Sequence, residues 1–184
     1  GRGQVAFANP SSPHWAGREA RILLEESREK LAQALGAKPQ EIFFTSGGSE
    51  SNNAVLRQLL TTSAEKHLIS STIEHPSVLE TCRILAEQKN IQFTELTVAS
   101  NGTIDAKNLN EAIRQETALI SLISANNETG KLQSIEELTK IAKQYQIPFH
   151  TDLTQAFGKI QLDLSKSRID YATATAHKLG GPRG

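Results

Sequence analysis

Four short polar segments of this 184-residue sequence contain side chains that could do chemistry and that a packed core does not require. The first, residues 45–53, reads Thr-Ser-Gly-Gly-Ser-Glu-Ser-Asn-Asn and follows a short apolar run. Free backbone N–H groups at a glycine turn that opens a helix suit a phosphate, because the helix dipole favours negative charge there. The segment lacks the Gly-Lys-Ser/Thr ending of a P-loop and the last glycine of a hydrolase elbow. It therefore predicts either a phosphate site or a simple capped turn between a strand and a helix.

The other three segments each place a reactive side chain at the end of an apolar run. His75 could stack on a planar ligand or move a proton, or it could be a polar residue at the boundary of the core. Asp152 needs a partner at the end of a buried strand, with Gln155 approaching the same side, or it could be a helix cap for the segment that follows. Lys178 follows a strand rich in small residues, so we expect partial burial, which favours the neutral, nucleophilic amine. The alternative is an ordinary surface lysine.

The four segments together suit one cofactor, pyridoxal phosphate (PLP). A helix N-terminus can hold its phosphate, and a lysine amine can form a Schiff base with its aldehyde. A carboxylate such as Asp152 keeps the ring nitrogen protonated, so that the ring draws electrons from the substrate. A histidine can cover the ring face. The combination therefore predicts a PLP site, which no single segment specifies.

The elements that must position these side chains alternate along the chain. Apolar periodicity and capping residues predict helices over 15–35, 50–60, 77–88, 105–115 and 134–145. Apolar runs predict strands over 42–45, 67–71, 91–98, 118–124, 147–151 and 171–176. We expect Gly36 to end the first helix, Asp105 to cap the fourth, and residues 134–137 to form a capping box on the fifth. The alternation predicts an α/β fold with three α/β/α layers and a mainly parallel sheet, in one domain or most of one.

Composition narrows the class of protein. The 20 basic residues balance 20 acidic ones, which argues against binding to nucleic acid or to a membrane surface by bulk charge. Apolar runs fall short of the roughly 18 residues that a membrane helix needs, and we expect no signal peptide. A single cysteine, Cys82, forms no intrachain disulfide, so we expect a reducing, cytoplasmic setting. One cysteine and five histidines without an H-E-x-x-H motif predict no metal site. Because the chain lacks methionine and ends on Gly-Gly-Pro-Arg-Gly, we expect it to be incomplete.

The sequence resembles the large domain of the cysteine desulfurases, PLP enzymes of the class V aminotransferase group. The matching segments occur in the family's order and are residues 9–12, 44–53, 74–75, 126–130, 150–152 with Gln155, and 176–178 with 181–184. The family often has Ala-Thr where this chain has Gly48-Ser49, and Ser where it has Thr175. Both changes keep a hydroxyl group, so the resemblance still implies phosphate binding.

The resemblance implies a role for each site residue. Lys178 would form the Schiff base with PLP and move the substrate proton, and His75 would stack on the ring as a second catalytic residue. Asp152 would pair with the pyridine nitrogen and Gln155 with the phenolic oxygen. Asn127 would lie near the phenolic oxygen and the substrate carboxylate. The phosphate would be held by Gly48, Ser49, Thr175 and His177.

The activity that this resemblance implies is that of a cysteine desulfurase. L-cysteine becomes L-alanine, and its sulfur passes to an enzyme cysteine as a persulfide, for iron–sulfur cluster assembly or another acceptor or scaffold protein. A homodimer is expected. Residues 1–184 would be a PLP-binding large domain of fold type I, without the N-terminal segment and the small C-terminal domain. That missing part would carry the nucleophilic cysteine and the arginine that binds the substrate carboxylate, whereas Cys82 would be structural.

Three alternatives stay open from the sequence. A selenocysteine lyase or a cystine/cysteine C–S lyase would use the same PLP residues on the same scaffold. A protein of another class, a non-catalytic piece that binds PLP or dimerises, would also fit, since these 184 residues lack the residues for sulfur transfer. Persulfide and alanine as products, against pyruvate and ammonia, would separate the desulfurase from the C–S lyase.

Overall fold

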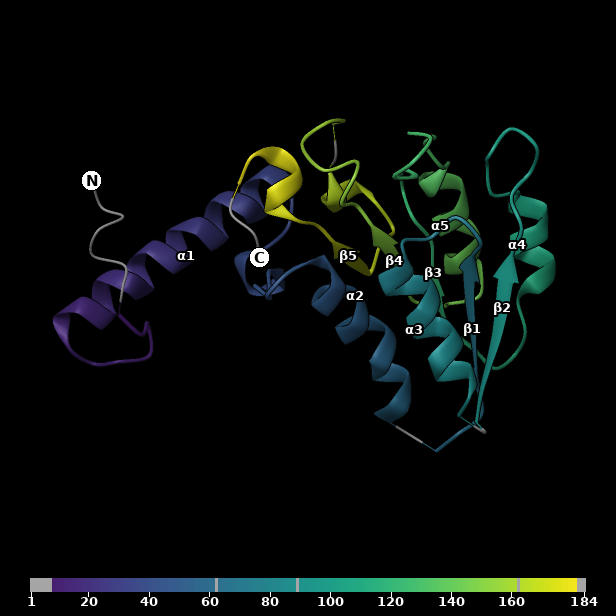
Figure 1. Ribbon diagram of the computed structural model, residues 1–184, viewed down its shortest axis with the longest axis horizontal. Helices are drawn as coiled ribbons and strands as arrows, with labels where there is room; N and C mark the ends of the chain where they lie inside the picture. The colour runs from purple at the N-terminus through teal and green to yellow at the C-terminus, as the bar shows by residue number, and fades with distance from the viewer. Residues whose placement is uncertain (1–7, 62, 89, 162, 182–184) are drawn as a thin grey trace. The chain divides into compact units, whose positions relative to one another are not determined.

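The apolar runs of the chain assemble into one parallel sheet (Figure 1). The computed structural model describes residues 8–61, 63–88, 90–161 and 163–181. The strands are β1 (Lys66–Ser71), β2 (Ile91–Leu96), β3 (Thr117–Ser121), β4 (Phe149–Asp152) and β5 (Tyr171–Thr173). Their order is β2-β1-β3-β4-β5, and every neighbouring pair is parallel. The chain therefore passes from β1 outward to β2 and then back to β3, which places the topological switch point between β1 and β3.

One face of the sheet packs against the helices α2 (Gly48–Arg57) and α3 (Pro76–Ala86). Leu68 of β1 and Leu119 of β3 point to this face, where they meet buried residues of both helices, among them Cys82. Each large side chain buried in this way contributes roughly 1.5–3 kcal/mol to folding. The apolar stripes of α2 and α3 thus cover the same face of the sheet.

The opposite face packs against α4 (Ala106–Ala112) and α5 (Ile135–Gln144). Ile69 and Ile120 directly follow the residues that point to the first face, so the two-residue period of a strand sends them to this second core. Phe149 of β4 is fully buried in the same core. Helices on both faces of a parallel sheet confirm the predicted three-layer α/β/α fold.

Several predicted element boundaries need correction. The fourth helix ends at Ala112 rather than near residue 115, because Ile113 has an extended backbone (φ −66°, ψ 135°). Its predicted cap is confirmed, since the side chain of Asp105 accepts a hydrogen bond from Lys107 N at 2.7 Å. The predicted capping box at residues 134–137 is wrong, and Ser134 makes no capping hydrogen bond with its side chain. The ψ of 60° at Ser134 departs from the extended backbone that aims an N-cap side chain at the helix.

The predicted strand at residues 42–45 is also wrong. These residues have no regular secondary structure, and the side chain of Phe43 is 82% exposed. The carbonyl of Ile42 accepts a hydrogen bond from the guanidinium of Arg28, and its N–H donates to Pro39 O at 3.1 Å. An apolar run becomes a strand only beside another strand, and within the described residues none pairs with this one.

The chain divides into two compact units, residues 45–161 with 167–184, which contain the sheet, and residues 1–44 with 162–166. The second unit contains the 21-residue helix α1 (Trp15–Leu35), η2 (Pro39–Glu41) and η4 (Leu164–Lys166). Gly36 ends α1 as predicted, with a left-handed φ of 68°. A Cβ there would lie 2.5 Å from Asp163 Oδ1. Over the described ranges, we find no helix with both the length and the apolar character needed to cross a bilayer.

Candidate active site

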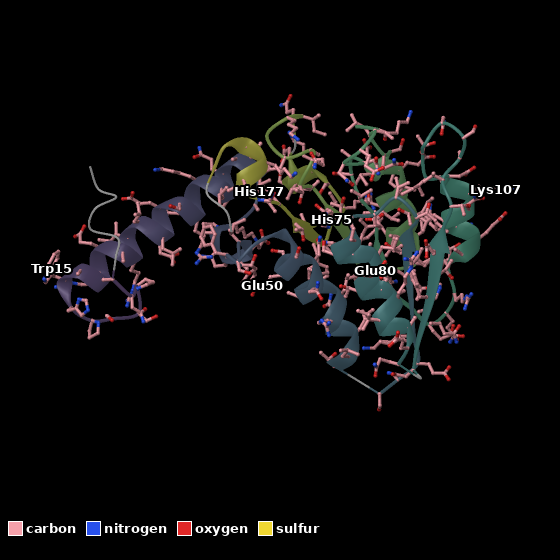
Figure 2. The ribbon with its side chains drawn as sticks, viewed as in Figure 1. Trp15, Glu50, His75, Glu80, Lys107 and His177 are labelled. Atoms are coloured by element: carbon pink, nitrogen blue, oxygen red, sulfur yellow. The ribbon has the colours of Figure 1, made fainter. Side chains whose placement is uncertain are left out.

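The carboxyl ends of β1, β3, β4 and β5 surround a cavity of about 320 Å³ within the sheet-containing unit. This is the edge of a parallel sheet at which ligands bind, and the volume falls in the range of small-molecule sites. The site residues predicted from the sequence all line it: Gly48, Ser49, His75, Asn127, Asp152, Gln155, Thr175, His177 and Lys178. Figure 2 labels two of them, His75 from the loop after β1 and His177 from the short helix that follows β5.

The N-terminus of α2 supplies one wall of the cavity. Within the described part of the chain, the backbone N–H groups of Gly48, Ser49 and Glu50 have no acceptor. A Cβ at Gly48 would lie 2.7 Å from Thr175 Cγ2, so the absence of a side chain lets the helix closely approach the segment that follows β5. The hydroxyl of Thr175 is buried and has no partner among the described residues. Unpaired donors at a helix N-terminus can bind a phosphate.

Asp152 occupies the end of β4 and is 4% exposed. Its Oδ1 accepts a hydrogen bond from Thr154 N at 2.8 Å, and its Oδ2 accepts one from Asn52 Nδ2 at 2.9 Å. The bond to Thr154 closes a local turn, and because residues 154–159 form turns and no helix, the helix cap that the sequence left open as an alternative is not formed. Asp152 also lines the cavity. Two donors satisfy a carboxylate that would otherwise be costly to bury. Its remaining lone pairs can accept the N–H of a cationic ring.

His75 lines the cavity and also caps α3. Its Nδ1 accepts a hydrogen bond from Ser77 N at 3.1 Å and lies 2.7 Å from Ser77 Oγ. Pro76 follows at the first helical position, where its missing N–H is no loss. His75 is therefore an exposed helix cap that also lines the cavity, and its role toward a ligand stays a prediction.

The predicted burial of Lys178 is wrong. Thr173 and Thr175 are buried, but the chain leaves the sheet after β5 and turns into the short helix η5 (Ala176–Leu179), where Lys178 is exposed. The strand of small residues ends three residues earlier than predicted, at Thr173 instead of residue 176, so the lysine lies beyond it at the cavity edge. Residues 182–184, which contribute to the sequence resemblance, lie outside the described residues.

Four residues that line the cavity have no role predicted from the sequence. They are Asn52, Ser77, Ile123 and Thr154. Asn52 carried a signal that could have been used, because it lies four residues before Leu56 on the buried face of α2. A polar residue on an otherwise buried helical face needs a partner, which here is Asp152.

Two further buried groups lie near the site. Burial raises the pKa of Glu74 to about 8, and the charge of Asp152 adds to the rise, although hydrogen bonds from Ser71 and from Ile123 N oppose it. Burial lowers the pKa of His150 to about 4, and its ring contacts the hydroxyls of Ser121 and Thr173 at 2.8 and 3.1 Å. Both groups are therefore predominantly neutral at neutral pH, which leaves Asp152 as the acidic group of the cavity.

This fold and this cavity define a class of protein. A three-layer α/β/α protein with a free helix N-terminus, a buried carboxylate, a histidine and a lysine at one sheet edge can hold a phosphorylated, ring-shaped cofactor. The sequence model of one family, aminotransferase class-V, matches residues 4–184. The chain belongs to the aminotransferase class-V family.

Individual relatives agree with this assignment. The chain is 47% identical to the cysteine desulfurase IscS of Dictyoglomus turgidum over 181 residues, which cover 97% of this chain and 45% of the relative. It is 41% identical to the human cysteine desulfurase, of which it covers 39%. A solved structure described as SspA in complex with cysteine is 41% identical, with a TM-score of 0.94 over 97% of this chain and 52% of that one. The chain spans about half the length of the curated relatives it matches.

Proposed function

We propose that residues 1–184 are the PLP-binding large domain of a cysteine desulfurase, an enzyme that converts L-cysteine to L-alanine and transfers the sulfur to an enzyme cysteine. The observation that carries the proposal is that Asp152 and Lys178, which the sequence assigned to opposite ends of one cofactor, line a single cavity. The relatives named cysteine desulfurase and the similar structure with bound cysteine support this substrate.

PLP fits the groups that the cavity offers. The free amides of α2 and the unpaired hydroxyl of Thr175 match a phosphate, and the carboxylate of Asp152 matches a protonated ring nitrogen. When bound, PLP supplies an electrophilic carbon and an electron-withdrawing ring. The proposed phosphate-binding residues are Gly48, Ser49, Thr175 and His177.

The other residues of the cavity would bind and orient the cofactor and the substrate. Lys178 would bind the cofactor aldehyde and carry the proton that leaves the α-carbon of the substrate. His75 would cover the ring face, and Gln155 would contact the phenolic oxygen. Asn127 would lie between that oxygen and the substrate carboxylate. Because Lys178 is exposed at the cavity edge, its amine would have room to move away from the cofactor aldehyde when the substrate amine takes its place.

The cysteine that receives the sulfur is not Cys82. This is the single cysteine of the sequence, it is fully buried against α2 and β1, and burial raises the pKa of its thiol to about 12. A thiol without appreciable thiolate is a poor nucleophile, so Cys82 serves the core. The acceptor cysteine of the proposed reaction therefore lies outside these 184 residues.

The proposal extends to the surroundings of the enzyme. We infer a homodimer that passes sulfur to an acceptor or scaffold protein for iron–sulfur cluster assembly. The unpaired Cys82 suits a reducing compartment such as the cytoplasm. One relative, from Schizosaccharomyces pombe, is named a probable mitochondrial cysteine desulfurase.

The test is to replace Lys178 in the full-length protein. Lys178→Ala should abolish both the visible absorbance of the lysine-bound cofactor and the formation of alanine and persulfide from L-cysteine. Lys140→Ala is the matched control, because Lys140 is exposed on α5 and pairs only with Glu136 among the described residues. A Lys178→Ala protein that keeps the absorbance band and full turnover would refute the proposal. Pyruvate and ammonia in place of alanine and persulfide would identify a C–S lyase.

A further inference from the structure

A continuous chain of hydrogen bonds joins Asp152 to His75 along the wall of the cavity. Asn52 Nδ2 lies 2.9 Å from Asp152 Oδ2 and 3.0 Å from Ser77 Oγ. Ser77 Oγ in turn lies 2.7 Å from His75 Nδ1. All four residues line the same cavity, although they come from α2, α3, the end of β4 and the loop after β1. The chain thus links the two groups that would contact the ring at its nitrogen and at its face.

The chemistry of the side chains fixes the direction of these hydrogen bonds. An amide nitrogen only donates, so both Asp152 and the hydroxyl oxygen of Ser77 accept from Asn52. The hydroxyl hydrogen of Ser77 is then free to be donated to His75 Nδ1, which also accepts from Ser77 N at 3.1 Å. Two donors at Nδ1 leave no place for a proton there. The neutral ring of His75 therefore carries its proton on Nε2.

Asn52 lowers the stability of the fold, so a purely structural role does not explain its presence. Its side chain is 1% exposed, and its Oδ1 has no partner among the described residues. An unpaired buried acceptor lowers stability, and an apolar residue next to Leu56 on this helical face would avoid that loss. Turning the amide over would set its oxygen against the carboxylate of Asp152, so the observed orientation is the one that the carboxylate requires.

The position of Asn52 in its helix adds a second consequence. Gly48 and Asn52 are four residues apart and share one face of α2. The same short helix therefore presents unpaired backbone N–H groups to one part of the cavity. At another part, its Asn52 side chain donates a hydrogen bond to the carboxylate of Asp152. Any shift of α2 would move both groups together.

We propose that Asn52 is a positioning residue that orients two groups at once: it holds the carboxylate of Asp152 toward the ring nitrogen, and through Ser77 it fixes His75 as the Nε2–H tautomer. The proposal rests on the proposed function, because it concerns the orientation of groups around a bound PLP ring. It adds that the ring-nitrogen partner and the ring-covering histidine are coupled through one side-chain amide.

The test compares four variants of the full-length, PLP-loaded protein. Asn52→Ala removes both donors, Ser77→Ala removes only the hydroxyl that links Asn52 to His75, and Asn52→Asp keeps the shape but replaces the donor by a carboxylate. Asn53→Ala is the matched control, because Asn53 is the next residue of α2 and does not line the cavity. Its side chain bonds Ser49 O, Thr81, Arg57 and the backbone oxygen of Ser77, but not the Ser77 hydroxyl that links Asn52 to His75. The measurements are the dissociation constant of PLP, the pH profile of its visible absorbance, and the imidazole ¹⁵N shifts of His75, assigned with a His75→Gln sample.

We expect the variants to separate the two functions. Asn52→Ala should weaken PLP binding by about tenfold or more and move the pH profile by about one pH unit, because a hydrogen bond to a charged group is lost. It should also shift the His75 resonances toward a mixture of tautomers. Ser77→Ala should change the resonances and leave the pH profile as in the wild type. Asn52→Asp should bind PLP more tightly as the pH falls, since its protonated form again donates to Asp152.

Distinct results would overturn distinct statements. If Asn52→Ala matches Asn53→Ala in the pH profile and in the ¹⁵N shifts, Asn52 is only structural and the inference is wrong. If Asn52→Ala fails to fold, unchanged His75 resonances in Ser77→Ala or pH-independent PLP binding in Asn52→Asp would refute it instead. If the wild-type protein itself binds no PLP, the proposed function fails first, and this inference fails with it.

Discussion

The buried carboxyl group of Glu74 should make the stability of the protein depend on pH. Glu74 is 7% exposed, and its Oε1 accepts hydrogen bonds from Ser71 Oγ and from Ile123 N. Its Oε2 has no partner among the described residues, and none of the ion pairs there includes it. Ionisation of this group in the folded protein therefore places an unpaired charge in the interior.

The sign and size of the effect follow from its pKa. Burial raises the pKa of Glu74 from 4.5 to about 8, so the folded state holds its proton where the unfolded chain has released it. The stability that this proton gives is fully present below pH 4.5 and is lost as the pH rises toward 8. By pH 7 the loss reaches on the order of 3 kcal/mol. Glu74→Gln keeps the acceptor oxygen and removes the ionisation, but its amide hydrogens lack an acceptor, which costs about 1 kcal/mol. We expect a net gain of about 2 kcal/mol at pH 7.

The measurement is denaturant unfolding of the wild type and of Glu74→Gln between pH 5 and pH 8. Their difference in the free energy of unfolding isolates Glu74, because His67 and His150, whose pKa values burial lowers to about 4, contribute equally to both. Glu136→Gln is the control, since Glu136 is exposed on α5 and its pair with Lys140 contributes little. Curves for the wild type and Glu74→Gln that run parallel over this range would refute the reasoning.

Two more substitutions test the cavity and the core. Gly48→Ala places a Cβ 2.7 Å from Thr175 Cγ2, so we expect PLP to bind at least about tenfold more weakly while circular dichroism stays unchanged; affinity equal to the wild type would contradict the role of the close approach. Cys82→Ala should lower the free energy of unfolding by roughly 1–2 kcal/mol and leave persulfide formation intact, because the thiol is buried in the core and has no appreciable thiolate form. Loss of sulfur transfer in a folded Cys82→Ala protein would show that this cysteine takes part in the reaction.

The layers of the fold could be predicted from local patterns in the sequence. Leu68 and Ile69 are both apolar, and a continuous apolar run is typical of a strand that is covered on both faces. The structure places Leu68 in the core under α2 and α3 and Ile69 in the core under α4 and α5, because successive side chains of a strand point to opposite faces. Nine of the residues that line the cavity could be predicted as well, because polar residues that follow buried strands of a parallel sheet meet at one edge. Their roles toward a cofactor stay predictions.

Features that depend on distant neighbours could not be predicted in this way. Residues 42–45 have the composition of a strand, but composition does not show whether a neighbouring strand exists to pair with them. Lys178 follows a segment in which Thr173 and Thr175 are buried, yet its own exposure depends on the residue at which the chain leaves the sheet. Strand ends are set by the register with the neighbour, and β5 pairs with β4 over only three residues.

The contact between Asn52 and Asp152 shows why a site is harder to predict than a fold. The two residues are 100 positions apart in the sequence. Each one fits its own local segment, Asn52 on the face of a helix and Asp152 at the end of a strand, so neither segment shows that the other is its partner. Their pairing follows only after α2 is packed on the sheet, because Leu56 of the same helix is buried in the core beside Leu68 and so sets the rotation of α2. The apolar contacts therefore determine which polar group reaches the carboxylate, and a change in the core under α2 should disturb the cavity even though it touches none of its lining residues.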